Sequence, residues 1–555
     1  MPPRLVRKRK QGRDYWYLVE SARVEGKPRV VSQRYLGPAE RVAELLAAQH
    51  EPLEARRRFV GPLALWALAE RLGIREAVDE LAPKRRQGIS VGQAIQLIAV
   101  NRAHRPCSKA RLQDWFGETA LARTLPLKAE QLSVQRLWDA MDRLSADRIE
   151  RVEERLARRL VHGFGVRAEL LCFDPTNLFT YLDTDTDSEL AKRGHSKQRR
   201  HDLRQVALAL LVTRDHQLPL FHESYAGDRP DAPTLRSLTG RLERRAEALG
   251  EQQLTLVFDK GCWSAGLAEE LAAGPFRFVA ALQASRYPQL MAVPLRRFRP
   301  LEGIEGTSAH RTRGEVSGSE RTLLVVHSQE FERTQRRGFQ QTLDKARRQL
   351  REIRAILERG RARRSRAQLE EKVAEILSPR WVARVLEVEL TGDEGALVLR
   401  YSTNQAELRR LERELFGKTL LVTDRDDWSD EEIVSAYRAQ NHTEQAFRQL
   451  KDPEFLAARP IFHWTDQKIR VHLFCCVLAL TLQNLLWREA EQAAIEASPK
   501  RLLRELRELT EVELIYAPAG GGAGRPRVAR KLATPPNALA QQLVETLDYG
   551  EPLPA

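Results

Sequence analysis

The stretch AELLCFD, at residues 168–174, decides the fold class, because it is a short apolar run that ends in a carboxylate. Similar turn-bounded runs follow it along the chain: VALALLVT (206–213), LPLFHESYA (218–226), LTLVFD (254–259) and FRFVAAL (276–282). Helical patterns at 231–249 and 263–273 separate the later runs. Three adjacent strands followed by strand, helix and strand predict a mixed sheet, so we expect an α/β protein.

The pattern of apolar residues changes on both sides of this sheet and predicts a chain of several domains. We expect the following segments: a basic arm and a small β-rich piece of two strands around Glu25-Gly26-Lys27 (1–55), a helical, possibly DNA-binding domain (56–165), the first part of the catalytic core (166–285), an insertion of strands and an Arg-rich helix (286–416), the second part of the core (417–495), and a C-terminal helix with a flexible basic tail (496–555).

The Arg-rich helix of the insertion has an unusual charge excess. Residues 333–366 hold thirteen basic residues against Asp344, Glu352 and Glu358. A solvated surface helix is one interpretation, and contact with the phosphates of a nucleic acid is the other.

The overall composition favours a polyanionic partner. The chain has 555 residues, 42% of them hydrophobic, and a formal net charge of +15. Nucleic acid is the commonest partner of a soluble protein with this balance, although an Arg-rich proteome would give a similar count. Five scattered cysteines indicate neither a disulfide framework nor a zinc site, so we expect a reducing cytoplasm. The longest apolar run, residues 473–482, is about half a membrane span and predicts a buried core helix.

Three carboxylates are the candidates for chemistry. Asp174 and Asp259 each follow an apolar strand, at the edge where open α/β sheets build their sites, and Glu444 lies on a predicted helix. Singly, Asp174 could start a turn and Asp259 could cap a helix. Converging carboxylates repel one another unless a cation compensates, and hard oxygen ligands favour magnesium or manganese. Together, the three predict a site for divalent metal ions.

The helix around Glu444 carries a polar stripe. In YRAQNHTEQAFRQLK, residues 437–451, five side chains fall within roughly 80° of one another around one helix axis. They are Tyr437, Gln440, Glu444, Arg448 and Lys451. A core-facing helix would be apolar there, so this stripe predicts a functional surface.

Three blocks of the sequence together resemble a known family. FDPTN, VFDKG and YRAQNHTEQAFRQLK resemble the three catalytic blocks of bacterial insertion-sequence transposases of the DDE type, whose last block reads Tyr, two residues, Arg, three residues, Glu, six residues, Lys. Tyr437, Glu444 and Lys451 match that spacing. The chain looks most like the branch of the insertion-sequence-four superfamily with a long insertion, since 185 positions separate Asp259 from Glu444.

The resemblance implies an RNase H-like core, interrupted by the insertion, in which Asp174, Asp259 and Glu444 are catalytic and bind two Mg²⁺, or Mn²⁺, ions. Tyr437 and Lys451 would hold phosphates near the scissile bond. The implied activity is cleavage at the ends of a transposable element and strand transfer into target DNA.

One position departs from the family pattern. Gln440 stands where the family has Arg, and glutamine carries no charge to clamp a phosphate. Arg448 is the expected substitute, because it lies one turn from Glu444 on the same face, whereas Arg438 points about 100° away from Tyr437.

A basic loop adds further candidate DNA contacts. The segment GHSKQRRHDLRQ, between the first two core strands, contains Lys197, Arg199 and Arg200. Its alternative interpretation is a mobile solvated loop.

The expected partner is double-stranded DNA, namely the terminal inverted repeats and the target. We expect a cytoplasmic protein that works on DNA as a homodimer or larger assembly, because joining two ends needs two active sites, and no membrane is involved. Two rivals stay open. One is an RNase H-like nuclease or resolvase without strand transfer, and the other is an inactive DNA-binding descendant.

Overall fold

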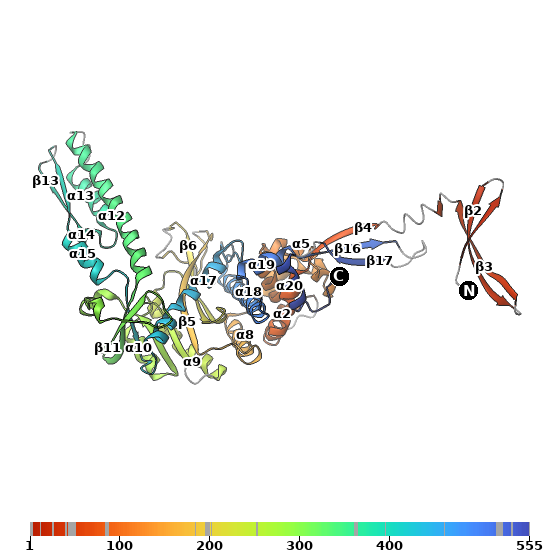
Figure 1. The fold of residues 1–555 in the computed structure, drawn as a ribbon, viewed down its shortest axis with the longest axis horizontal. Helices are drawn as coiled ribbons and strands as arrows, with labels where there is room; N and C mark the ends of the chain where they lie inside the picture. Colours follow the sequence, from red (N-terminus) through yellow and green to blue (C-terminus); the bar gives the residue numbers. More distant parts are fainter. Residues whose placement is uncertain are drawn as a thin grey trace. The chain divides into compact units, whose positions relative to one another are not determined.

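The protein divides into two compact units in the computed structural model (Figure 1). Unit 1 contains Met1–Asp79, Pro83–Arg143 and Leu482–Ala555, and unit 2 contains Glu80–Ala82 and Leu144–Thr481. The structure describes residues 4–10, 13–24, 27–38, 41–42, 52–83, 88–183, 185–194, 200, 202–250, 254–359, 365–393, 396–459, 461–517, 526–533 and 537–553.

A nine-stranded mixed sheet forms the centre of unit 2, as the strand pattern predicted. Its order is β10-β11-β12-β15-β9-β8-β5-β6-β7. Only the neighbours β5, β8 and β9 run parallel, and every other pair is antiparallel. The strands are β5 (Leu170–Thr180), β6 (Arg204–Thr213), β7 (Pro219–Ala226), β8 (Leu254–Phe258), β9 (Phe276–Ala281), β10 (Arg299–Pro300), β11 (Thr307–Val316), β12 (Ser319–Ser328) and β15 (Lys418–Thr423).

Two strands of this sheet were missing from the sequence prediction, namely β11 and the two-residue β10. β11 carries charged residues and lacks an apolar run, so its sequence, TSAHRTRGEV, gives no strand signal. It forms a tight hairpin with β12, in which Val316 pairs with Ser319. The two turn residues, Ser317 and Gly318, have φ angles of 55° and 81°, as a two-residue hairpin turn requires. Because β10, β11 and β12 belong to the large sheet, the segment that leaves the sheet begins after β12 and not at residue 286.

The helices of unit 2 outside that segment pack on the sheet or extend its connections. They are α8 (Ala146–Arg158), α9 (Asp231–Leu249), α10 (Ala265–Ala273), α11 (Pro288–Met291), α16 (Asp430–Arg438), α17 (Gln440–Lys451) and the first part of α18 (Asp466–Gln492). α9 has the bounds that periodicity predicted, and α18 is the expected long core helix. α18 is the one helix in the described parts of the chain that is long and apolar enough to cross a membrane, but 94% of its apolar window is buried.

A buried ion network ties α8 to β7 and α9. Glu153 on α8 accepts from Arg245 at 3.5 Å and lies 2.5 Å from the His222 ring nitrogen Nδ1. Glu153 and Arg245 are only 6% and 4% exposed. Burial lowers the pKa of Arg245, yet the neighbouring carboxylates keep it an ion.

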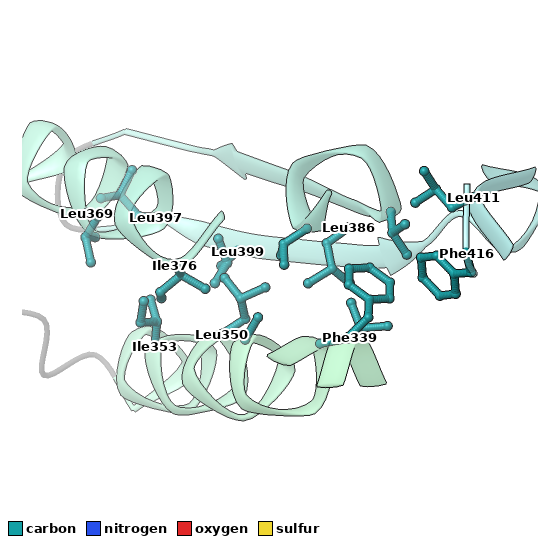
Figure 2. Packing of buried hydrophobic residues seen from close by; sticks show 14 residues of the cluster. Phe339, Leu350, Ile353, Leu369, Ile376, Leu386, Leu397, Leu399, Leu411 and Phe416 are labelled. Atoms are coloured by element: carbon teal, nitrogen blue, oxygen red, sulfur yellow. The ribbon is translucent and has the colours of Figure 1, made fainter. Parts of the chain in front are cut away.

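The chain leaves the sheet after β12 and builds a subdomain with its own core. Its elements are α12 (Gln329–Glu358), α13 (Arg366–Leu377), α14 (Val382–Val385), β13 (Leu386–Thr391), β14 (Val398–Thr403) and α15 (Gln405–Glu414). Figure 2 shows Phe339, Leu350 and Ile353 of α12 pointing towards Ile376, Leu386 and Leu399. This core stabilises α12, because the apolar stripe of the helix is buried from Phe339 to Ile353.

Truncating the centre of this core should unfold the subdomain selectively. Leu350 is fully buried, so Leu350→Ala is expected to cost about 2–5 kcal/mol through lost burial and a residual cavity. Hydrogen exchange should then rise in α12–α15 and stay unchanged in β5, β8 and β9. Ile356→Ala, on the same helix at a half-exposed position, is the control, with an effect within about 0.5 kcal/mol. Uniform exchange throughout unit 2 would contradict an independent core.

Unit 1 holds two small sheets and a group of helices. Its elements are β1 (Arg4–Lys10), β2 (Arg13–Val24), β3 (Lys27–Pro38), β4 (Glu54–Phe59), α2 (Gly61–Leu72), α3 (Ile74–Asp79), α4 (Val91–His104), α5 (Leu112–Gly117), α6 (Leu121–Thr124), α7 (Val134–Asp142), α19 (Pro499–Glu508), β16 (Thr510–Tyr516), β17 (Arg527–Leu532) and α20 (Ala538–Thr546). The sheets have the orders β1-β2-β3 and β17-β16-β4.

Both ends of the chain are more ordered than the sequence indicated. The basic arm is a strand, β1, paired with β2 from Arg4↔Val19 to Lys10↔Arg13. The basic tail contributes β17, which pairs with β16, and a second helix, α20. β16 also pairs with β4, so the C-terminal segment returns to the N-terminal part of the chain. Residues 518–525 and 534–536 of the tail lie outside the described residues.

Candidate functional site

The register of two central strands brings Asp174 and Asp259 together. β5 and β8 pair in parallel from Leu170↔Thr255 to Phe173↔Phe258. Asp174 and Asp259 are each the next residue, so they stand side by side where β8 ends. Both are half-buried. The predicted pair of strand-borne carboxylates is therefore present at one point of the sheet.

Asp174 differs from expectation in one respect, because it lies inside its strand and not after it. β5 continues to Thr180, paired with β6, and Asp174 is opposite Leu210. The following Pro175, which has no N–H group to donate, is tolerated because β8 has already ended on the other side of β5. Thr176, two residues beyond Asp174, shares its face of β5.

The predicted single helix of the polar stripe is two helices. α16 ends at Arg438 and α17 begins at Gln440, with Ala439 between them. Ala439 is 3% exposed and keeps helical dihedral angles, so the break is slight. Serine at position 429 starts α16 with a capping box, in which Glu432 reaches back to the Ser429 N–H.

Both ends of the stripe reach the strands that carry the aspartates. The Tyr437 hydroxyl donates to Asp259 Oδ1 at 3.3 Å. At the other end, Lys451 Nζ donates a short hydrogen bond to Thr176 Oγ1. Glu444 lies midway, seven residues from each, which is close to two full helical turns. The stripe therefore faces the same edge of the sheet as Asp174 and Asp259.

Glu444 stands apart from the two aspartates. Its side chain is 60% exposed and accepts from Arg448 at 3.4 Å. Gln440 is half-buried, and Arg438 turns the other way, donating to Thr307 Oγ1 at 2.6 Å. Arg448 therefore lies beside Glu444 and Arg438 does not, which agrees with the helix geometry. The role of Arg448 as a phosphate-binding residue in place of Gln440 stays a prediction.

The pKa of the Tyr437 hydroxyl is raised by burial and by two of the three carboxylates. Burial is the largest cause of its raised pKa, followed by the charge and hydrogen bond of Asp259 and the charge of Glu444. Tyr437 therefore stays a phenol at neutral pH and acts as a hydrogen-bond donor.

The basic loop is only partly described. Lys197 and Arg199 lie outside the described residues. Arg200 is exposed and bound to Asp202 by two hydrogen bonds of 2.9 and 2.8 Å. The interpretation of this loop as a DNA contact stays a prediction.

A cavity of about 500 Å³ opens beside Asp259 and Tyr437. The subdomain contributes Phe331, Gln335 and Trp381 to its lining. Trp381 also packs against Phe339 and Phe416, with ring centroids 6.2 and 5.4 Å away. This cavity was not predictable from the sequence, because its wall combines several segments that are distant along the chain, from Asp259 to Tyr437.

Lys418, the first residue of β15, also lines the cavity. It is 6% exposed and donates to the carbonyl oxygens of Met291 and Val293 at 2.6 and 2.8 Å. Burial lowers its pKa to about 8. Its Nζ group fixes the 291–293 turn that forms part of the wall.

This lowered pKa predicts a pH-dependent stability. The folded chain loses the Lys418 proton at a lower pH than the unfolded chain does, so the wild type should gain stability as pH rises from about 8 to about 10. The neutral amine still has two N–H groups for both carbonyls. The measurement is the free energy of unfolding of wild type minus that of Lys418→Met across this range. A difference that does not change with pH would contradict the buried charge.

The two aspartates supply donor atoms that suit a divalent metal ion, but Glu444, the third predicted ligand, is not gathered with them. Within the described ranges, no three His, Cys, Asp or Glu side chains are gathered where one ion could bind them all. Asp174 and Asp259 supply adjacent hard oxygen donors, which magnesium prefers. Glu444 is exposed, and among the described residues Arg448 is its one side-chain partner, so its side chain is able to change rotamer.

The chain was compared with known families, curated proteins and solved structures. No family model and no curated protein matches the sequence. Among solved structures, the chain is similar to a piggyBac transposase determined by cryo-EM in a synaptic complex with hairpin DNA. The TM-score is 0.38 at 8% sequence identity, over 80% of this chain and 79% of that one. The roles of individual residues therefore rest on the geometry and chemistry of this chain.

Proposed function

We propose that this protein is a divalent-metal-dependent DNA transposase, which cleaves the ends of an insertion sequence and joins them to target DNA. The observation that carries the proposal is the register that sets Asp174 beside Asp259 where β8 ends. Tyr437 contacts Asp259, and Lys451 contacts Thr176 on the face of Asp174, while Arg448 lies on the same helical stripe beside Glu444. All three side chains can donate hydrogen bonds to phosphate oxygens. Enzymes that cleave phosphodiester bonds with metal ions combine carboxylates that bind the metal with side chains that donate hydrogen bonds to the phosphate.

Asp174, Asp259 and Glu444 would hold the metal, as two Mg²⁺ or Mn²⁺ ions. When bound, such ions activate the attacking oxygen and stabilise the leaving one. The chain itself prepares the ligands. The Tyr437 hydroxyl orients Asp259 through Oδ1, and Glu444 has only to release Arg448 to turn towards the aspartates.

The cations of α17 would hold the DNA backbone. Arg448 is 78% exposed, and a glutamate that turns to metal frees its guanidinium for a phosphate. Lys451 lies against Thr176 on the face of Asp174, near where a scissile phosphate would sit. Gln440 can donate a hydrogen bond there without charge. The same reasoning extends to Lys197, Arg199 and Arg200 of the basic loop.

We further propose that the sheet is an RNase H-like core and that the chain belongs to the insertion-sequence-four superfamily, on the strength of the FDPTN, VFDKG and Tyr437–Lys451 blocks. The active form would be a homodimer or larger assembly on double-stranded DNA, in the cytoplasm.

The test uses the full chain with duplex DNA that ends in the inverted repeats flanking its own gene. With magnesium, we expect cleavage at the repeat ends and joined products in a target plasmid. Cleavage without joining would instead identify a nuclease or resolvase. Specific binding with no cleavage under magnesium or manganese would identify an inactive descendant.

A further inference from the structure

The outer face of α12 carries a stripe of arginines. Arg333, Arg337, Arg348 and Arg351 fall within about 60° of one another around the helix axis. All four are exposed, and none has a hydrogen bond or ion pair within the described part of the chain. They extend over about 27 Å of helix. We call these four residues the arginine stripe.

The other arginines of α12 are already paired. Arg336 binds Glu332 and Glu412 at 2.9 and 2.8 Å, and Arg347 binds Asp344 at 3.3 Å. Arg354 lies 3.5 Å from Glu358 and covers the Tyr401 ring. Asp344 lies on the same face and pairs with Arg347. Glu330 and Glu352 also lie on or beside this face, but within the described part of the chain neither forms an ion pair with an arginine of the stripe. The arginines of α12 therefore fall into two groups: three that form ion pairs, and the four of the arginine stripe, which form none within the described residues.

The stripe is held rigidly and points away from the subdomain core. The buried residues of α12 lie away from the stripe, and two of them, Ala346 and Ile353, lie roughly opposite it around the axis. In Figure 2 the labelled side chains of α12 all point to one side, towards the rest of that core. A solvated face would gain nothing from four like charges at this spacing, since neighbours of the same sign repel.

The stripe also faces away from the candidate site. Phe331 and Gln335, which line the cavity beside Asp259, project roughly 150° around the axis from the stripe. A polyanion on the stripe would therefore lie on the far side of α12 from this cavity.

We propose that the arginine stripe binds the sugar-phosphate backbone of a stretch of duplex DNA that lies outside the cavity. Its length matches about eight base pairs. Exposed arginines without base-reading partners fix phosphates irrespective of sequence. The proposal rests on the proposed function only for the choice of DNA as the polyanion.

The test measures affinity of the full-length protein for an unrelated 20-base-pair duplex as a function of salt, without divalent metal. In the triple variant Arg337→Gln/Arg348→Gln/Arg351→Gln, the negative slope of log affinity against log salt should become shallower by about 3. Its affinity for the duplex at low salt should be more than about tenfold weaker than that of the wild type. The matched control is Arg336→Gln/Arg347→Gln/Arg354→Gln, which removes the same charge from the same helix and should keep the slope within about 1.

If both triple variants lose the same affinity and slope, the effect depends on net charge alone and the proposal is wrong. The proposal is also wrong if neither variant loses affinity. If a triple variant fails to fold by thermal melting, Arg348→Gln against its neighbour Arg347→Gln gives the same comparison, with an expected slope change of about 1. The readout needs no cleavage. If the stripe variant shows the expected change in slope but the wild-type protein never cleaves DNA, the proposed function is wrong and the stripe proposal stands. If the wild-type protein cleaves DNA but the stripe variant has the same salt slope as wild type, the stripe proposal is wrong and the proposed function stands.

Discussion

Asp259→Asn and Asp174→Asn should each lower the rate of magnesium-dependent DNA cleavage about a thousandfold or more, because metal binding supplies several kcal/mol and each 1.4 kcal/mol is a factor of ten. An amide oxygen is a weaker ligand than a carboxylate, and it carries no charge to offset the cation. Glu444→Gln should act in the same direction. The measurement is single-turnover cleavage of end-labelled duplex DNA.

The control for these variants is Asp215→Asn. Asp215 is an exposed aspartate of the same unit, paired with Arg167 at 2.6 Å and outside the candidate site, so cleavage should stay at the wild-type rate. Affinity for duplex DNA in the absence of metal should not fall in any of the four variants. Wild-type cleavage by Asp174→Asn or Asp259→Asn would remove these residues from the site.

Glu153→Ala should destabilise unit 2 by about 3–5 kcal/mol, because it leaves a buried guanidinium without its carboxylate. Arg245 is only 4% exposed, and its remaining hydrogen-bond partners among the described residues are the carbonyl oxygens of Leu220 and Glu150, at 3.4 and 3.3 Å. The His222 ring would lose its partner as well. Urea unfolding at pH 7 measures the effect.

A double substitution distinguishes ion pairing from simple loss of packing. Glu153→Leu/Arg245→Leu removes both charges and should recover much of the stability, since apolar replacement of a whole buried pair is often neutral. A double variant no more stable than Glu153→Ala would contradict the explanation. Asp215→Ala, which breaks an exposed pair, should give no measurable change.

The central strands were predictable because burial on both faces makes them continuous apolar runs. β6 and β8 are such cases, and the position of Asp259 followed directly from the end of β8. β11 was not predictable, because its partner β12 supplies the apolar residues of that hairpin. Strand length also escaped prediction in β5, where pairing with β6 carries the chain past Pro175.

The candidate site was predictable in its residue types and spacing, and not in its contacts. Sequence spacing placed Tyr437, Glu444 and Lys451 on one face. It could not reveal that Tyr437 binds Asp259 or that Lys451 binds Thr176, since these contacts depend on how α16 and α17 dock on the sheet. Nor could it reveal that Glu444 is still turned towards Arg448.

The subdomain of α12–α15 enters and leaves the sheet at one point. The Ser328 N–H, at the end of β12, donates to the Gly417 carbonyl at 2.9 Å, just before β15. Gly417 has a φ of 72°, and a side chain there would meet Ser328 O at 2.9 Å, so only glycine fits this crossing. β12 and β15 are therefore an ordinary antiparallel pair whose turn has been replaced by a folded module. At such a crossing the whole module could be removed and replaced by a short turn without a change in the register of β12 and β15.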